Sequence, residues 1–157
     1  MRVHIATDHA GLELSQFLVN ELTHEGFDLV DHGPTSYDAL DDYPSFCINA
    51  ALAVVADQKM GLDSLGIVLG GSGNGEQIAA NKVQGARAAL AWNQDTARLA
   101  REHNDANVIA VGARQHSQAE VLELILTFLR EPFSHDERHV RRIGKIAVYE
   151  QTGEVLL

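Results

Sequence analysis

The sequence predicts an α/β fold with a single doubly wound domain, in which a five-stranded parallel sheet lies between helices. Short apolar runs alternate with longer stretches of helical periodicity, which is typical of successive βα units. Three of the apolar runs are rich in Val and Ile and nearly continuous, as expected for parallel strands covered on both faces. With 157 residues, 45% of them hydrophobic, the chain can bury one sizeable core, so we expect one domain over residues 1–157.

Five stretches are candidates for the strands. They cover residues 2–7, 27–32, 65–70, 86–91 and 107–112. The fourth stretch contains four alanines and has weak strand propensity, so we predict a strand there from its place in the alternation. Five βα units in a row imply right-handed crossovers and a Rossmann-like parallel sheet.

Helical patterns fill the intervals between these strands. The last two predicted helices each begin with a capping box, in which Ser is followed three positions later by Glu. The two capping boxes are Ser117 with Glu120 and Ser134 with Glu137. The predicted helices cover residues 11–25, 44–59, 75–81, 94–102, 117–131 and 134–151.

Charge and composition exclude several classes of protein. The formal net charge of −10 argues against non-specific binding to nucleic acid, which needs clustered basic residues. The single cysteine, Cys47, excludes an intramolecular disulfide framework and suits a reducing compartment. The amino terminus lacks the apolar core of a signal peptide, and no run approaches the roughly 20 apolar residues of a membrane span. We therefore expect a soluble, cytoplasmic protein that binds neither nucleic acid nor a membrane.

A glycine-rich loop follows the third predicted strand, with four glycines in six positions before Glu76. Glu76 stands where the dinucleotide fingerprint G-x-G-x-x-G needs its last glycine, and that fingerprint normally follows the first strand. The triphosphate-binding loop needs Lys and then Ser or Thr where this chain has Glu76 and Gln77. The loop therefore has neither nucleotide-binding pattern.

The same loop is suited to holding an anion beside a base. Successive backbone N–H groups at a helix start can stabilise an anion, and Ser72 adds a hydroxyl donor. A carboxylate beside such a site suits abstraction of a proton from a carbon next to a carbonyl, and Glu76 lies in the first turn of the following helix. Alternatively, Glu76 only stabilises its helix through the dipole, and the motif alone leaves both interpretations open.

Two further polar clusters lie at element ends. Asp8 and His9 follow the first strand, and His103 and Asn104 come just before the fifth. Each has a structural alternative, because an aspartate can cap a helix and a histidine can interact with a helix dipole. The chain has no HExxH motif and no paired cysteines, so we expect no metal site.

The last predicted helix carries a concentration of positive charge. Four of the twelve basic residues fall within eight positions there, and two of these arginines share one helix face with two histidines. On so acidic a chain this indicates an anionic small ligand or a subunit contact, with a solvated helix face as the alternative. Arg114, after the fifth strand, is a further candidate for binding an anion. The basic residues of the helix are Arg138, Arg141, Arg142 and Lys145, and the shared face carries His135, Arg138, His139 and Arg142.

Taken together, these motifs resemble the ribose-5-phosphate isomerase B family (RpiB/LacAB sugar-phosphate isomerases) over essentially the whole chain. The matching segments are "DHAG" (8–11), "DDYP" (41–44), "GSGNGEQIAANK" (71–82), "REHNDANV" (101–108) and "RHVRR" (138–142). Many relatives have a cysteine base in a "CGTG" loop, and Gly70 takes the place of that cysteine here. The "GSGNGE" form resembles the actinobacterial branch of the family, which uses a glutamate as the base.

The resemblance implies a reversible aldose–ketose isomerisation through an enediolate, with no metal or organic cofactor. It implies that Glu76 moves the proton between C1 and C2, that Ser72 and the loop amides form the anion hole, and that His103 with Asp8 opens the furanose ring. His9 and three arginines would hold the phosphate, Asn104 would contact the open chain and Tyr43 would line the pocket. The full set of implied substrate-binding residues is His9, Tyr43, Gly71, Gly73, Asn74, Gly75, Asn104, Arg114, Arg138 and Arg142.

The resemblance also implies a homodimer, or a tetramer built from dimers, with sites at the dimer interface and the last helix packing on the partner. The leading prediction for the substrate is the pair D-ribose 5-phosphate and D-ribulose 5-phosphate of the pentose phosphate pathway. Erythrose 4-phosphate, allose 6-phosphate and galactose 6-phosphate stay open as alternatives, and we expect the loop 33–43 to limit the chain length of the sugar. A non-catalytic module that binds a sugar phosphate is the alternative from a different class.

Overall fold

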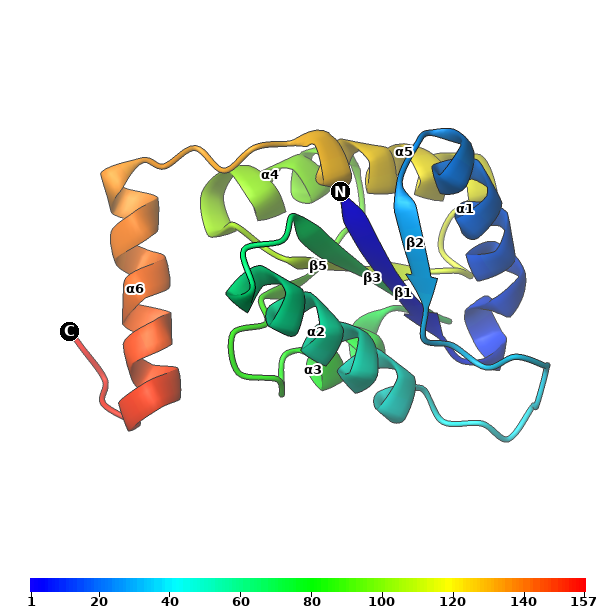
Figure 1. Ribbon diagram of the computed structural model, residues 1–157, viewed down its shortest axis with the longest axis horizontal. Coiled ribbons are helices and arrows are strands. Elements are labelled where there is room, and N and C mark those ends of the chain that lie inside the picture. The colour runs from blue at the N-terminus through cyan, green and yellow to red at the C-terminus, as the bar shows by residue number, and fades with distance from the viewer.

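A five-stranded parallel sheet runs through the centre of the computed structural model, which describes residues 1–157 (Figure 1). The order of the strands is β2-β1-β3-β5-β4, so β2 and β4 form the two edges. The bounds are β1 (Arg2–Thr7), β2 (Asp28–Asp31), β3 (Ser64–Gly70), β4 (Ala88–Leu90) and β5 (Val108–Gly112). All five predicted strands are confirmed. The alanine-rich fourth strand is short and lies at an edge, where it pairs only with β5.

Helices cover both faces of the sheet (Figure 1). Helices α1, α4 and α5 cover one face with large aliphatic and aromatic side chains, while α2 and α3 cover the other mainly with alanine and valine. A short 3₁₀ turn, η1, precedes α1. The bounds are η1 (His9–Gly11), α1 (Leu12–His24), α2 (Tyr43–Lys59), α3 (Asn74–Ala80), α4 (Gln94–Asn104), α5 (Gln118–Arg130) and α6 (Glu137–Thr152).

One of the two predicted capping boxes is confirmed and the other is wrong. The Ser117 hydroxyl accepts from the backbone N–H of Glu120, and the Glu120 carboxylate accepts from the backbone N–H of Ser117 at 2.8 Å. The last helix begins at Glu137 rather than at Ser134. The Ser134 hydroxyl is instead 2.9 Å from Nδ1 of His139. His135 has a φ of 57°, which lies outside the range of a right-handed α-helix, so the helix cannot include this residue.

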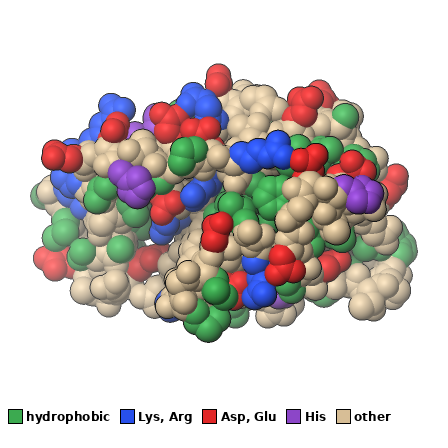
Figure 2. All heavy atoms as spheres, turned by 45° about the horizontal axis from the view of Figure 1, so that its top comes forward, with side chains coloured by type: hydrophobic (Ala, Val, Ile, Leu, Met, Phe, Trp, Pro, Cys, Tyr) green, Lys and Arg blue, Asp and Glu red, His purple; other side chains and the backbone are tan.

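Helix α6 stands apart from the rest of the chain, at the left of Figure 1. Only His139 of its residues is buried, and Ile146 and Tyr149 remain about half exposed. Figure 2 shows basic side chains gathered over this helix on the left, whereas acidic side chains are spread over the whole visible face. Neither α6 nor any other helix is long and apolar enough to span a bilayer.

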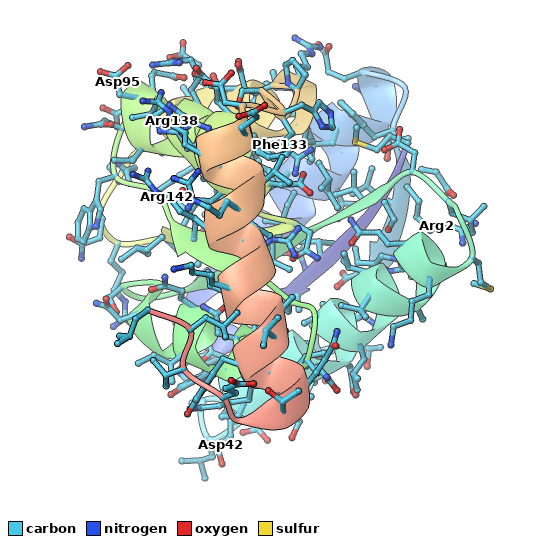
Figure 3. The ribbon with its side chains drawn as sticks, turned by 90° about the vertical axis from the view of Figure 1, so that its left-hand side faces the viewer. Arg2, Asp42, Asp95, Phe133, Arg138 and Arg142 are labelled. Atoms are coloured by element: carbon cyan, nitrogen blue, oxygen red, sulfur yellow. The ribbon has the colours of Figure 1, made fainter.

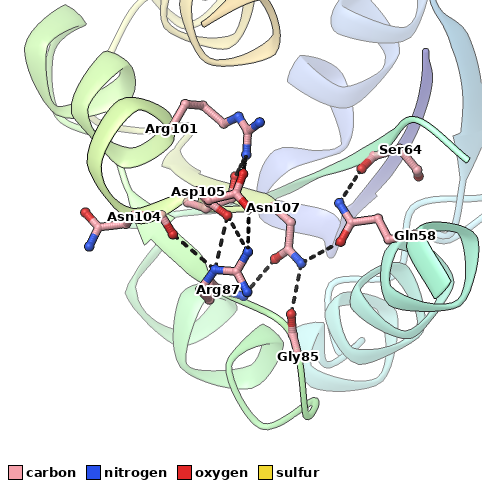
Figure 4. Close-up of polar contacts among 9 residues, drawn as sticks. Gln58, Ser64, Gly85, Arg87, Arg101, Asn104, Asp105 and Asn107 are labelled. Atoms are coloured by element: carbon pink, nitrogen blue, oxygen red, sulfur yellow. Dashed lines mark hydrogen bonds and ion pairs between the residues drawn. The ribbon is translucent and has the colours of Figure 1, made fainter. Parts of the chain in front are cut away.

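A polar network holds the carboxyl end of α4 in place (Figure 4). Asp105 ends this helix in a left-handed conformation with a φ of 44°. Arg101 donates to one oxygen of the Asp105 carboxylate at 2.7 Å, and Arg87 donates to the other at 3.1 Å and to the Asp105 carbonyl at 2.7 Å. Two arginines on one carboxylate therefore fix the segment that carries His103 and Asn104.

Candidate active site

A pocket of about 500 Å³ lies at the carboxyl ends of β1 and β3. These strands are neighbours at the point where the strand order changes direction, which is where open α/β sheets bind their ligands. The lining residues come from the loop after β1, the start of α2, the glycine loop and the turn after β5. They are Asp8, His9, Ala10, Tyr43, Gly71, Ser72, Gly75, Glu76, Arg114 and Gln115. Eight of these residues were expected from the sequence, and Ala10 and Gln115 were not.

Close packing explains two of the glycines in the loop after β3, Gly73 and Gly75. Gly73 has a φ of 81° and precedes α3, and a Cβ on it would lie 2.7 Å from a methyl carbon of Leu90. A Cβ on Gly75 would overlap the Tyr43 hydroxyl, which lies directly over it. The Ser72 hydroxyl accepts from the backbone N–H of Asn74 at 3.3 Å. Gly73 and Asn74 thus shape the loop without lining the pocket itself.

Glu76 occupies the space beside Gly70. A Cβ on Gly70 would overlap the Oε1 and Cδ atoms of the Glu76 carboxyl group. No side chain at position 70 can therefore coexist with this carboxylate in its present place. The absence of a side chain at position 70 therefore leaves room for the carboxylate of Glu76 where it lies.

The Glu76 carboxyl group has the electrostatic setting of a general base. Its residue is only 4% exposed, and burial raises its pKa, with the negative charge of Asp8 adding to the rise. The backbone amides of Glu76 itself and of Gly73 partly counteract this effect. A carboxylate with a raised pKa binds a proton more readily than an exposed one, as a base for a carbon-bound proton requires.

Cys47 lies buried in α2 near these carboxylates. Burial, and then the charges of Glu76 and Asp8, raise the pKa of its thiol to about 12. The thiol stays protonated at neutral pH, so it has no thiolate to act as a nucleophile or base.

Asp8 and His9 enter the pocket from the end of β1. Asp8 acts as the predicted cap, because its Oδ1 accepts from the backbone N–H of Ala10 at 2.9 Å, and it also lines the pocket. The His9 ring donates from Nδ1 to Oδ1 of Asp41 at 2.7 Å. The hydrogen bond to Asp41 is the main reason that the pKa of His9 is raised.

Asp41 was not expected as a site residue, although it begins the "DDYP" segment. Together with Asp8 and His9 it forms a set whose ligand atoms lie within 4.8 Å of one another, so these three residues could in principle hold a cation. The 2.7 Å contact between Nδ1 and Oδ1 is a hydrogen-bond distance. Two ligands of one zinc ion, each about 2.0–2.2 Å from it in tetrahedral geometry, would lie farther apart. Within the set, His9 and Asp41 therefore have the geometry of a hydrogen-bonded aspartate–histidine pair.

Besides Gly73 and Asn74 of the loop, four expected residues do not line this pocket: His103, Asn104, Arg138 and Arg142. His103 instead stacks on His139 of α6, with 4.2 Å between the ring centroids. Asn104 lines a groove between the β4 edge and α6. Arg138 and Arg142 lie one turn apart on the same flank of α6 (Figure 3). Figure 3 also places Arg138 near the end of the molecule opposite to Asp42, which adjoins the pocket residue Tyr43.

The chain is similar to known proteins over nearly its whole length. The family model described as "Ribose/Galactose Isomerase" matches residues 3–146. Ribose-5-phosphate isomerase B of Mycolicibacterium paratuberculosis is 57% identical over 152 residues, which cover 97% of this chain and 93% of that protein. The protein of the same name from Mycobacterium tuberculosis is 55% identical over 154 residues, which cover 98% and 93%.

Solved structures of similar proteins have the same fold. The type B ribose 5-phosphate isomerase of Trypanosoma cruzi superposes with a TM-score of 0.88 at 39% identity, covering 98% of each chain. Ribose-5-phosphate isomerase B of Mycoplasma genitalium with bound ribulose-5-phosphate has a TM-score of 0.88 at 40% identity, covering 96% of this chain and 97% of that one.

Proposed function

The chain belongs to the ribose/galactose isomerase family, and we propose that it is an enzyme that interconverts D-ribose 5-phosphate and D-ribulose 5-phosphate. The observation that carries this proposal is Glu76, a buried carboxylate with a raised pKa in a polar pocket at the strand ends. Two relatives that are 55–57% identical are ribose-5-phosphate isomerases B, and a similar solved structure contains ribulose-5-phosphate. The two relatives and the structure with the bound ligand support a five-carbon substrate.

In the proposed reaction the Glu76 carboxylate removes the proton from C2 of the open-chain aldose. The electrons of the broken C–H bond form the C1–C2 double bond of an enediolate, and the carbonyl oxygen takes up the negative charge. The Ser72 hydroxyl and the backbone N–H groups of the loop stabilise this oxygen. A proton moves from the hydroxyl oxygen on C2 to the oxygen on C1, so that the negative charge lies on the C2 oxygen. Glu76 then returns its proton to C1, and a carbonyl forms at C2, which completes the ketose. The reverse sequence of steps converts the ketose into the aldose.

We propose that a second copy of the chain completes the site. His9 and Arg114 provide positive groups within the pocket, but His103, Arg138 and Arg142 lie elsewhere in the same chain. Helix α6 projects from the body and leaves apolar side chains half exposed, as expected for a helix that packs on another subunit. A homodimer would bring the α6 arginines of one protomer to the Glu76 pocket of its partner.

The proposal is tested by turnover of purified protein on four aldose phosphates in the presence of EDTA. The substrates are ribose 5-phosphate, erythrose 4-phosphate, allose 6-phosphate and galactose 6-phosphate. We expect the highest kcat/KM for ribose 5-phosphate, with EDTA having no effect. A higher kcat/KM for another sugar would leave the chemistry in place and replace the proposed substrate. No turnover of any of the four by folded protein would refute an isomerase and favour a binding module.

A further inference from the structure

The loop between β2 and α2 contributes a carboxylate that holds His9 at the edge of the pocket. Two N–H groups of His9, the backbone amide and ring Nδ1, donate to the same oxygen of Asp41, at 2.9 and 2.7 Å. The two residues are 32 positions apart in the chain. Because one oxygen accepts from both the main chain and the ring, the imidazole cannot turn without breaking a hydrogen bond.

This contact determines which nitrogen of His9 is free for a ligand. A carboxylate only accepts hydrogen bonds, so Nδ1 carries the proton that Asp41 binds. The other nitrogen, Nε2, has no hydrogen-bond partner within the chain, and His9 lines the pocket. When the ring is charged, Nε2 also carries a proton and is a donor for an anion.

The environment of the second carboxylate oxygen of Asp41 favours a positive charge on His9. Oδ2 of Asp41 is buried and has no hydrogen-bond partner, and the side chain as a whole is only 12% exposed. A buried carboxylate with one unpartnered oxygen is unfavourable unless a positive charge compensates it. His9 is the side chain in direct contact with Asp41 that can supply this charge, when its ring is protonated.

We propose that Asp41 is a positioning residue that locks His9 and pairs with its charge, so that Nε2 donates to the phosphate group of the substrate. This inference rests on the proposed function, because it requires a substrate that carries a phosphate. A charged imidazole is a stronger donor to a phosphate oxygen than a neutral one. Other titratable groups also face His9 or the same pocket, and among them the charge of Asp8 adds to the rise in the pKa of His9. They are Asp8, Tyr37, Tyr43, Glu76 and Arg114.

The test compares Asp41→Asn with Asp42→Asn in the full-length protein. Asn can still accept both hydrogen bonds but removes the negative charge. Asp42 is the neighbouring residue, and its side chain makes no capping hydrogen bond. For Asp41→Asn we expect KM for ribose 5-phosphate to rise about tenfold near neutral pH, as loss of roughly 1.4 kcal/mol of binding predicts, with a much smaller change in kcat. The pH above which KM rises should also move downward. Asp42→Asn should change neither quantity.

Two measurements do not depend on turnover. The first is an NMR titration of His9, whose pKa should lie above the ordinary value of 6.5 in the wild type and fall in Asp41→Asn. The second is the affinity for inorganic phosphate, which should weaken about as much as KM rises. If both hold but no sugar phosphate is converted, the aspartate–histidine pair stands and the proposed function fails.

Several outcomes would overturn the inference. One is equal KM and phosphate affinity in Asp41→Asn and the wild type, which would make the contact merely structural. Another is a His9 pKa at or below its ordinary value in the wild type, a measurement that remains possible if Asp41→Asn does not fold. A third is a double-variant cycle with His9→Gln in which the two effects on KM simply add, since a residue that acts through His9 should add nothing once His9 is gone.

Discussion

The Glu76 pocket and the basic face of α6 differ in how completely a single chain assembles them. Asp8, Ser72 and Glu76 follow neighbouring strands, and the sheet itself brings them together. Arg138 and Arg142 lie on a helix that makes little contact with its own sheet. The carboxyl ends of neighbouring parallel strands lie side by side, so the residues that follow them meet at one site. The side chains of a helix that projects from the body reach a ligand only where that helix packs on another surface. We therefore expect base chemistry to depend on one chain and phosphate binding to depend on two.

The largest expected effect is that of removing the base. Glu76→Gln should lower kcat by about 10²–10⁴-fold, because the amide cannot accept the substrate proton. The measurement is turnover of ribose 5-phosphate by protein whose fold is verified by circular dichroism. Glu123→Gln, a matched change at an exposed position of α5, should keep wild-type turnover. Near-normal turnover in Glu76→Gln would show that another group is the base.

The raised pKa of Glu76 also predicts opposite effects on activity and stability. A carboxyl group whose pKa is higher in the folded state stabilises the fold below its ordinary value of 4.5 and loses that contribution as pH rises through the folded pKa. At neutral pH Glu76→Gln should therefore have a higher Tm than the wild type, and the difference should vanish near pH 4. Wild-type kcat should fall in acid at a pH above 4.5. A lower Tm for the variant at neutral pH would contradict the electrostatic account.

The next largest effect concerns Gly70, since its missing side chain makes room for the carboxylate of Glu76. Gly70→Ala should displace this carboxylate and reduce kcat by about the same factor as loss of the base, with KM less affected. Because a thiol at position 70 would occupy the space of the carboxylate, Gly70→Cys combined with Glu76→Ala should recover part of the turnover lost in Glu76→Ala. Gly70→Ser combined with Glu76→Ala is the matched control and should recover none. Wild-type kcat in Gly70→Ala would refute the steric argument.

A smaller effect is expected from the arginines of α6. Arg142→Ala should raise KM for ribose 5-phosphate by roughly 10- to 100-fold, the range for loss of a hydrogen bond to a charged group. Mixing Arg142→Ala protein with Glu76→Gln protein tests whether the site is shared. A heterodimer would contain one site with both residues intact, so turnover should recover after subunit exchange. No recovery once exchange is verified would place both residues in the site of the same chain.

The smallest effect is expected from a change at Asp57, a buried carboxylate outside the pocket. Its pKa is shifted in the opposite direction to that of Glu76. His4 Nε2 lies 3.0 Å from the Asp57 carboxylate, and the hydrogen bond to His4 is the main reason that the pKa of Asp57 is lowered. A lowered pKa stabilises the fold fully above the ordinary value of 3.8, and this contribution is lost as pH falls through the folded pKa. Asp57→Asn should therefore reduce the free energy of unfolding by about 1–3 kcal/mol at neutral pH.

The measurement for Asp57 is Tm across a pH series. The difference from the wild type should shrink below about pH 4, and kcat should stay unchanged, because Asp57 is paired with a structural partner. Asp63→Asn, at an exposed position nearby, should leave Tm unchanged throughout. A constant difference across all pH values would show that packing, rather than charge, accounts for the stability.

Much of the fold was predictable because its signals are local. The five strands follow from short apolar runs, and the Ser117 capping box is a contact over three residues. The predicted start of α6 was wrong because the Ser134 hydroxyl makes a contact with the His139 ring that competes with capping of the helix. Residue propensities do not show whether a serine hydroxyl will bind a backbone N–H of the helix or a nearby histidine ring.

The sequence alone determined the chemistry available to the site, because residue types and spacing suffice to place Ser72 and Glu76 at the start of one helix. Only the tertiary structure decided how these groups behave. The raised pKa of Glu76 needs burial and the charge of Asp8 from another strand, and the orientation of His9 needs Asp41 from a distant loop. Desolvation and charge pairing depend on distances in space between residues remote in the chain, and no local pattern encodes those distances.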